Sequence, residues 1–185
     1  MQDLAGFFGA FVIFGLASML VLHLAEADHD READSGARSG LAIWLLAFFH
    51  ANTVVAAAGA DVAKVPLPEL PLLVAGIVIG TTGWLLFVWA TLALVRGADF
   101  EGLQTRRLVT RGPYRLARHP QSLGWTLLLL GVAVGSRSII ALVLVVAFAL
   151  FARRHARIEE RQLAQRFGDG FERYRGSTPS ALGLR

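Results

Sequence analysis

The residues best suited to chemistry stand at two places in the chain, about forty residues apart. Arg118, His119 and Pro120 precede an apolar segment, whereas Glu159 and Glu160 follow one. Proline suits the first turn of a helix, so Pro120 predicts a helix that begins there and places His119 at its cap. Because the positive end of the helix dipole opposes protonation, we expect a neutral histidine. These groups predict a polar pocket at a membrane surface or, alternatively, an interfacial cap with basic anchors.

The two glutamates fall on a predicted amphipathic helix with regular spacing. Residues four positions apart share one helix face, and six recur in this way: Phe151, His155, Glu159, Leu163, Phe167 and Phe171. Arg153, Arg157 and Arg161 form a second row. Glu159 is thus in line with residues expected to pack inward, and a buried carboxylate needs a partner. Neighbouring arginines and a cationic ligand are both candidates, while a solvated face remains open for Glu160 and Glu172.

Membrane helices are expected to position these residues. The 185-residue chain is 55% hydrophobic, with a mean hydropathy of +0.53. Charge-free apolar runs long enough to cross a hydrocarbon core of about 30 Å cover 4–24, 41–60 and 72–95. Two shorter runs, 123–135 and 139–152, predict a tight helical hairpin. The expected fold class is an all-α integral membrane protein with about five transmembrane helices, including this C-terminal hairpin, followed by an amphipathic cytoplasmic helix.

The chain is expected to form a single domain, 1–185. Its predicted parts are three N-terminal membrane helices (1–95), a cytoplasmic connection (96–121), the hairpin (122–152) and a cytoplasmic C-terminal helix and tail (153–185). Six arginines lie between 96 and 118 and eight between 153 and 185. The positive-inside rule therefore places the C-terminus in the cytoplasm and the N-terminus outside. Basic flanks beside an anionic leaflet explain the pI of about 10.6 without a nucleic-acid partner.

Other polar groups carry weaker signals. The acidic segment 26–34 is better explained as a solvated loop than as a metal site, because no ligand spacing is present. His50 and Asn52 lie within an apolar run, where an interhelical hydrogen bond is favoured over a substrate contact. The chain has no cysteine, which excludes thiolate metal sites and disulfides. It also lacks a glycine-rich phosphate loop, so any nucleotide-like cofactor is held without a Rossmann domain.

The motifs together resemble the isoprenylcysteine carboxyl methyltransferases and related membrane phospholipid methyltransferases. The resemblance covers roughly 92–180. It rests on Leu108-Val109-Thr110, Gly112-Pro113-Tyr114-Arg115, Arg118-His119-Pro120 with Gly124, and Arg157-Ile158-Glu159-Glu160-Arg161, followed by Leu163, Phe167-Gly168, Tyr174 and Pro179. One position departs from the pattern: Ser122 stands where a tyrosine is usual, and Trp125 is a candidate to supply the missing ring.

The resemblance implies an integral membrane methyltransferase that binds S-adenosylmethionine at the cytoplasmic surface and uses no metal. The implied cofactor-binding residues are Gly112, Pro113, Tyr114, Arg118, His119, Pro120, Leu123, Gly124, Glu159 and Glu160. Glu159, Glu160 and Arg157 are the implied catalytic residues. The acceptor would be lipophilic: a carboxylate, amine or thiol of a lipid, a prenylated substrate or a small amphiphile. An amine would have to lose a proton, which His119 or Glu159 could take.

Two alternatives stay open. Sterol-type membrane reductases, which use NADPH, resemble this family in their C-terminal helices, although the short chain and the glutamate pair favour a methyltransferase. A non-enzymatic membrane scaffold that retains the fold is the other alternative, with Ser122 as its best support. The bias of 17 arginines against one lysine indicates a GC-rich genome and therefore a bacterial inner membrane. The sequence predicts no oligomeric state.

Overall fold

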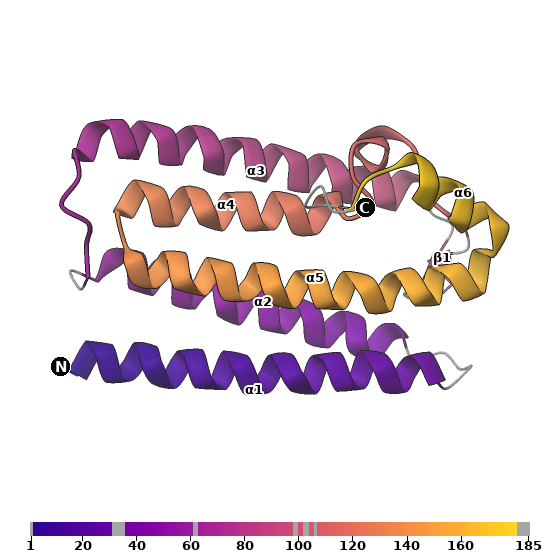
Figure 1. The fold of residues 1–185 in the computed structure, drawn as a ribbon, viewed down its shortest axis with the longest axis horizontal. Helices are drawn as coiled ribbons and strands as arrows, with labels where there is room; N and C mark the ends of the chain where they lie inside the picture. The colour runs from indigo at the N-terminus through magenta and orange to yellow at the C-terminus, as the bar shows by residue number, and fades with distance from the viewer. Residues whose placement is uncertain are drawn as a thin grey trace.

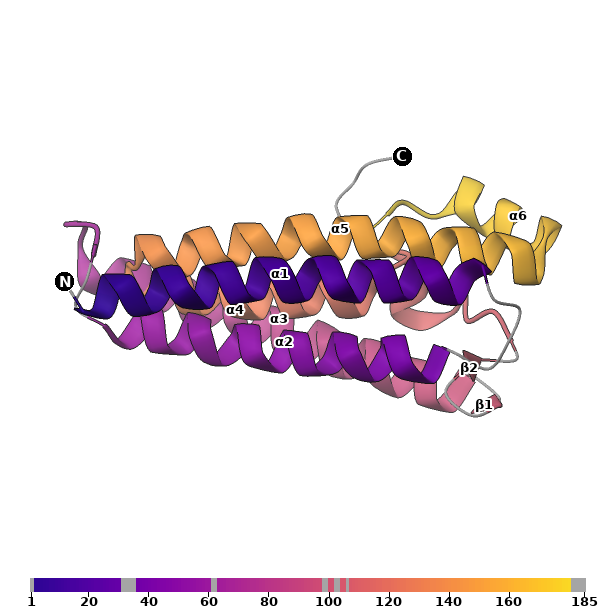
Figure 2. The ribbon, with the colours of Figure 1, turned by 90° about the horizontal axis from the view of Figure 1, so that it is seen from below.

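The protein is a bundle of long helices that run along a common axis (Figures 1 and 2). The computed structural model describes residues 2–30, 36–60, 63–97, 100–101, 104–105 and 107–180. The long helices are α1 (Gln2–Asp30), α2 (Gly36–Gly59), α3 (Glu69–Gly97), α4 (Pro120–Ser136) and α5 (Ile139–Phe167). The smaller elements are β1 (Phe100–Glu101), β2 (Gln104–Thr105), the 3-10 helix η1 (Gly112–Arg115) and α6 (Asp169–Ser177). β1 and β2 pair antiparallel, and the other regular elements of the described segments are helices.

Within the residues that the structure describes, three helices are long and apolar enough to cross a membrane. They are Ala42–Gly59 within α2, all of α3 and all of α5. The apolar part of α1, Phe8–Leu24, is shorter. Large apolar side chains are exposed on these helices; Phe48 is 68% exposed and Ile77 is 59% exposed. Exposed apolar surface over whole helix faces is what a lipid environment requires, so the expected helical membrane fold is confirmed at this level.

Helices α3 and α4 touch backbone to backbone through glycines. A Cβ atom at Gly76 would lie 2.6 Å from the carbonyl oxygen of Gly131, and one at Gly124 would lie 2.6 Å from the backbone nitrogen of Phe87. Both distances are far below van der Waals contact, so only glycine allows the two helices to approach this closely. The contact fixes α4, which carries His119 at its start, against α3.

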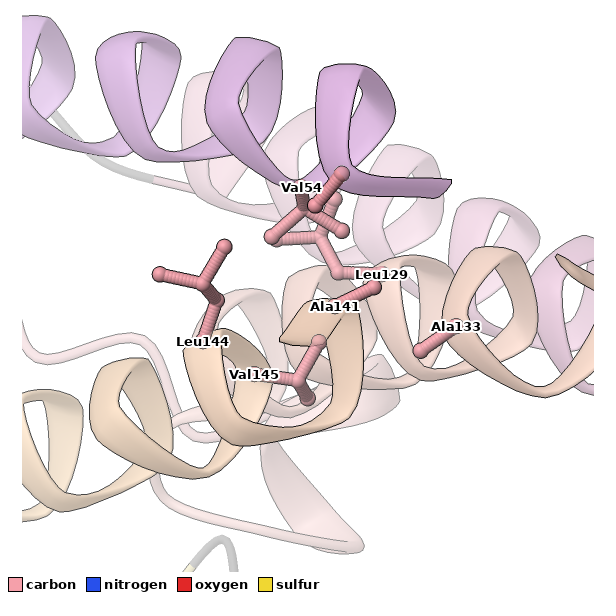
Figure 3. Packing of buried hydrophobic residues seen from close by; sticks show 7 residues of the cluster. Val54, Leu129, Ala133, Ala141, Leu144 and Val145 are labelled. Carbon is pink, nitrogen blue, oxygen red and sulfur yellow. The ribbon is translucent and has the colours of Figure 1, made fainter. Parts of the chain in front are cut away.

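The apolar core joins α2, α4 and α5. Figure 3 shows part of it, in which Val54, Leu129, Ala133, Ala141, Leu144 and Val145 pack together. At the end of the bundle where α4 turns into α5, Arg137 adopts a left-handed conformation. Ser138 then caps α5 by accepting a hydrogen bond from the Ala141 amide, and it donates one to the Ala57 carbonyl of α2 at 3.1 Å. This end of the bundle is therefore firmly tied together.

His50 makes the interhelical hydrogen bond that its position predicts, whereas Asn52 does not. His50 is fully buried between the rings of Phe14 and Phe148, and its Nε2 donates to the Leu144 carbonyl of α5 at 2.8 Å. Asn52 is exposed and donates to the Phe48 carbonyl of its own helix. The expectation of a bond between helices was therefore wrong for Asn52, because its side chain points out of the bundle.

Two helices extend beyond their apolar runs. Helix α5 continues without a break through 29 residues to Phe167, so the second arm of the expected hairpin and the amphipathic helix are one element. Helix α1 reaches Asp30, so the first part of the acidic segment 26–34 is helical and not a loop. Residues 31–34 of that segment lie outside the described residues.

Candidate functional site

The approach to α4 is set by the turn Arg111–Arg115. Gly112 has a φ of +63°, a conformation that glycine adopts without strain, and Pro113 follows in η1. Pro113 and Tyr114 are buried. The Tyr114 ring packs with the aromatic residues of α6, and its carbonyl accepts a 2.7 Å hydrogen bond from the Tyr174 hydroxyl. The turn thus joins the end of α3 to α6.

Helix α4 begins at Pro120 with His119 as its cap, as predicted. The His119 side chain is 6% exposed and lies between the two glutamates of α5. Its Nδ1 is 3.2 Å from Glu159 Oε2, and its Nε2 is 3.1 Å from Glu160 Oε1. The structure therefore brings together residues that are about forty positions apart in sequence. Both ring nitrogens are used, one for each carboxylate.

His119 is charged, in contrast to the neutral state expected from its place at the helix cap. Burial alone would lower its pKa, but the negative charge of Glu159 and the hydrogen bonds to Glu159 and Glu160 raise the pKa to about 9. The expectation was wrong because two carboxylates at hydrogen-bonding distance outweigh a helix dipole, whose effect is typically below 1 kcal/mol. At neutral pH both ring N–H groups donate, so His119 has no lone pair with which to accept a proton.

Arg118 completes the cluster by binding the same carboxylate oxygen of Glu160 that His119 contacts. Its side chain is 8% exposed, and its Nε donates to Glu160 Oε1 at 2.8 Å. The same guanidinium donates to the backbone carbonyls of Arg175 and Thr178, and the Arg118 amide donates to the Pro179 carbonyl at 3.0 Å. Arg118 thus binds the segment after α6 to the cluster, and its donors are occupied by protein groups.

A cleft between α4 and α5 opens beside the cluster. It is lined by His119, Ser122, Leu123, Thr126, Ala149, Ala152, Arg153, Ala156 and Ser180. His119 is the residue that belongs to both the cluster and the cleft. The Glu159 side chain is 46% exposed, whereas that of Glu160 is 16% exposed. Glu159 is therefore the more accessible carboxylate of the pair.

Other sequence-predicted residues are placed elsewhere. Gly124 faces the backbone of α3, and Gly112 lies beside Trp89, so neither lines the cleft. Arg157 is exposed on α5 and makes no hydrogen bond or ion pair with any residue the structure describes. Trp125 packs against Phe87, with ring centroids 5.2 Å apart, and does not replace the missing ring in the cleft.

Sequence reasoning missed Arg153, Ser180 and the small residues of α5 as parts of the site. The signal for the small residues of α5 was the spacing of Ala149, Ala152 and Ala156, which places three small side chains on one helix face. Arg153 stood in the predicted arginine row without any sign that it borders a cleft. No local pattern marked Ser180, because its position depends on the return of the chain after α6.

The helical fold, the lipid-compatible surface and the charged cluster define a membrane protein with a buried ionic site beside a small cleft. A family model, phospholipid methyltransferase, matches residues 72–170, which is more than half of the chain. The chain therefore belongs to the phospholipid methyltransferase family and is a membrane methyltransferase. The resemblance seen in the motifs is confirmed. No curated protein and no solved structure matches the chain significantly.

Proposed function

We propose that the protein transfers a methyl group from S-adenosylmethionine to a lipophilic acceptor at the cytoplasmic membrane surface. The observation that carries the proposal is the cluster of Arg118, His119, Glu159 and Glu160 beside the cleft between α4 and α5. Membership of the methyltransferase family supports the reaction class. The bilayer on one side of the cleft and water on the other would let a lipid and a polar cofactor meet.

The residues present fit this cofactor. S-adenosylmethionine carries an ammonium group and a sulfonium, and the cluster offers an accessible carboxylate in Glu159. Oε2 of Glu159 is held by His119, which leaves its other oxygen for a cationic ligand. Two cations and two carboxylates make the cluster neutral, so a ligand with a net positive charge meets no repulsion there. The cofactor supplies a methyl group on a positively charged sulfur.

The residues of the chain would align the methyl donor with the acceptor and would exclude water. Displacement at a methyl carbon needs no nucleophile from the protein. Arg118 fixes Glu160, and protonated His119 fixes both carboxylates. A carboxylate acceptor would need no base. An amine acceptor would have to lose a proton, but protonated His119 has no lone pair to accept it and Glu159, ion-paired with His119, is a weak base.

We further propose that α1 and α4 also cross the bilayer, giving five crossings in one domain of 185 residues. The arginine-rich connection and tail support a cytoplasmic C-terminus and an external N-terminus. The arginine bias supports a bacterial inner membrane. The apolar run of α1 and the close packing of α4 on α3 agree with this arrangement.

Calorimetric titration of the detergent-purified protein tests the cofactor directly. S-adenosylmethionine and S-adenosylhomocysteine should both bind saturably, and NADPH should not. His119→Ala should weaken the binding of both adenosyl ligands by at least about tenfold, because it removes the group that holds the two carboxylates in place. Arg161→Gln, which changes an exposed arginine of α5, is the control. Binding of neither adenosyl ligand to a folded sample would refute the proposal and favour a scaffold.

A further inference from the structure

We propose that the three residues after α6, Thr178, Pro179 and Ser180, form a movable strap that opens to let S-adenosylmethionine enter and leave the cleft. This inference rests on the proposed function and adds a gate to it. The strap is fastened by Arg118, the residue that also binds Glu160. It takes no part in the making or breaking of bonds during methyl transfer.

The cleft between α4 and α5 is too small for the proposed cofactor as it stands. Its volume is about 20 Å³, which is room for about one water molecule. S-adenosylmethionine is a nucleoside joined to an amino acid, and pockets for ligands of that size typically measure about 300 Å³ or more. One wall of the cleft therefore has to move before the cofactor can bind.

The two helical walls are held in place. Helix α4 touches the backbone of α3, since a Cβ atom at Gly83 would lie 2.6 Å from the Gly124 carbonyl oxygen. Helix α5 is bound to α4 through the ion pairs of His119 with the two glutamates, and to α2 through the bond from Ser138 to the Ala57 carbonyl. Movement of either helix would disrupt the packing or the charged cluster on which the site depends.

The strap is the third wall, and it is held by fewer interactions. Beyond α6 the chain turns back along the bundle (Figures 1 and 2), and Ser180 lines the cleft. The Arg118 amide donates to the Pro179 carbonyl at 3.0 Å, and the Arg118 guanidinium donates to the Thr178 carbonyl. Within the described part of the chain, the bonds that tie the strap to the start of α4 all come from this one arginine.

Helix α6 provides a fixed base from which the strap can swing. Phe171 is fully buried, and the Tyr174 hydroxyl donates to the Tyr114 carbonyl at 2.7 Å. The helix ends at Ser177, so the chain beyond it is free of the helical hydrogen-bond ladder except for the bond from the Thr178 amide to the Tyr174 carbonyl. The strap can therefore leave the cleft by releasing the bonds from Arg118, while α6 stays docked.

A reversible cross-link tests the gate, because the chain has no cysteine of its own. Ser122→Cys on α4 and Ser180→Cys on the strap are combined, since both side chains line the same small cleft. A short bis-methanethiosulfonate reagent joins the two thiols in the detergent-purified full-length protein, and dithiothreitol releases them. Linking before tritiated S-adenosylhomocysteine is added should reduce its binding at least about tenfold, and linking afterwards should slow its release at least about tenfold.

The two single-cysteine variants, treated with the same reagent, are the matched controls. A reagent group that merely fills the cleft would lower binding in these variants, but it would not trap a ligand that is already bound. A second measurement loosens the strap instead of locking it. Pro179→Gly frees the backbone that proline restricts, so it should raise both the association and the dissociation rate of S-adenosylhomocysteine by about threefold or more. Arg173→Gln, an exposed residue of α6, should leave both rates unchanged.

Three results would overturn the inference. One is equal binding and release of S-adenosylhomocysteine by the linked and the reduced double variant. Another is a failure of the reagent to join the two thiols in the folded protein, because the strap would then not border α4. The third is a rise in the dissociation rate alone in Pro179→Gly, which would make the strap a contact for the ligand and not a gate. Normal binding that ignores the link refutes the gate alone, whereas no adenosyl binding by the unsubstituted protein refutes the proposed methyl transfer as well.

Discussion

His119 donates one ring N–H to each of two carboxylates, and this arrangement makes its stability contribution depend on pH. Its pKa rises from 6.5 in the unfolded chain to about 9 in the fold. The folded protein therefore holds this proton more tightly, and the resulting stabilisation is fully present below about pH 6.5. It is lost as the pH rises from there through about 9.

We therefore expect the melting temperature in detergent to fall between pH 6.5 and 9.5. Circular dichroism at a series of pH values measures it. His119→Gln, which cannot become charged, should have a lower melting temperature at pH 6.5 and a flatter profile. A profile of unchanged slope in His119→Gln would assign the pH dependence to other groups.

Glu159 and Glu160 are adjacent in sequence but differ in burial, and they should behave differently when neutralised. Glu160→Gln leaves buried Arg118 without its counter-charge, so we expect a loss of stability approaching the 3–5 kcal/mol typical of a broken buried pair. Glu159→Gln alters the more exposed carboxylate, so we expect at least about tenfold weaker S-adenosylhomocysteine binding and a small change in stability. Calorimetry and thermal unfolding separate the two effects. Full activity in both variants would rule out the assigned pocket.

Ser122 leaves space in the cleft that a tyrosine would fill. It is half-buried and lines the cleft with Leu123 and Thr126. Ser122→Tyr should therefore weaken the binding of dodecyl phosphate, a single-chain amphiphile that serves as a probe of the cleft, by about tenfold. The affinity for S-adenosylhomocysteine and the melting temperature should change little. Ser122→Ala, which keeps the cleft open, is the matched control. Tighter binding of the amphiphile by the tyrosine variant would show instead that the ring completes an unfinished wall.

At the scale of the helices, the close contact between α3 and α4 depends on glycines, which have no side chain. A Cβ atom at Gly131 or Gly83 would overlap backbone atoms of the facing helix. Gly83→Ala should therefore lower the free energy of unfolding by about 1–3 kcal/mol or more, as measured by denaturant titration in mixed micelles. Gly15→Ala in α1, where no atom lies within 4 Å of a new Cβ, should be neutral or slightly stabilising. Equal effects would mean that α3 and α4 are less closely packed.

The start of α4 could be predicted from sequence, but the length of α5 could not. Pro120 is a local signal, since proline fixes its own backbone and costs nothing at a first turn. The apolar run that indicated the second hairpin arm ends at Ala152, yet α5 continues to Phe167. Hydropathy marks where a chain leaves lipid, whereas alanine, arginine, glutamate and glutamine continue a helix in water as well. The same distinction explains why α1 reaches Asp30.

At the scale of the whole molecule, the absence of cysteine makes the proposed orientation easy to test. Leu67 lies between α2 and α3 and is 51% exposed, whereas Ser177 is an exposed residue at the end of α6. In intact cells, an impermeant maleimide should label Leu67→Cys and should label Ser177→Cys only after permeabilisation. The opposite pattern would reverse the orientation and place the cluster outside the cell.

The site was predictable where it depends on spacing and unpredictable where it depends on the path of the chain. The four-residue row identified Glu159, and the Pro120 signal identified His119. The distances between these side chains and the charge of the histidine could not be predicted, because both depend on how α4 packs against α5. The bonds from Arg118 to the carbonyls near Thr178 depend on the reversal at Gly168, whose φ is +51°. No sequence pattern states where such a reversal brings the chain.

The glycine contact also decides which interactions would have to be given up to make room for a bulky acceptor. Because α4 cannot withdraw from α3 without separating two backbones, the pair behaves as a rigid unit. Helix α5 is held by side chains instead: Ser138 donates to the Ala57 carbonyl of α2 near one end, and the glutamates pair with His119 and Arg118 toward the other. Any widening between α4 and α5 would therefore be opposed by the ion pairs of the cluster, whereas the backbone contact of α3 with α4 would stay intact.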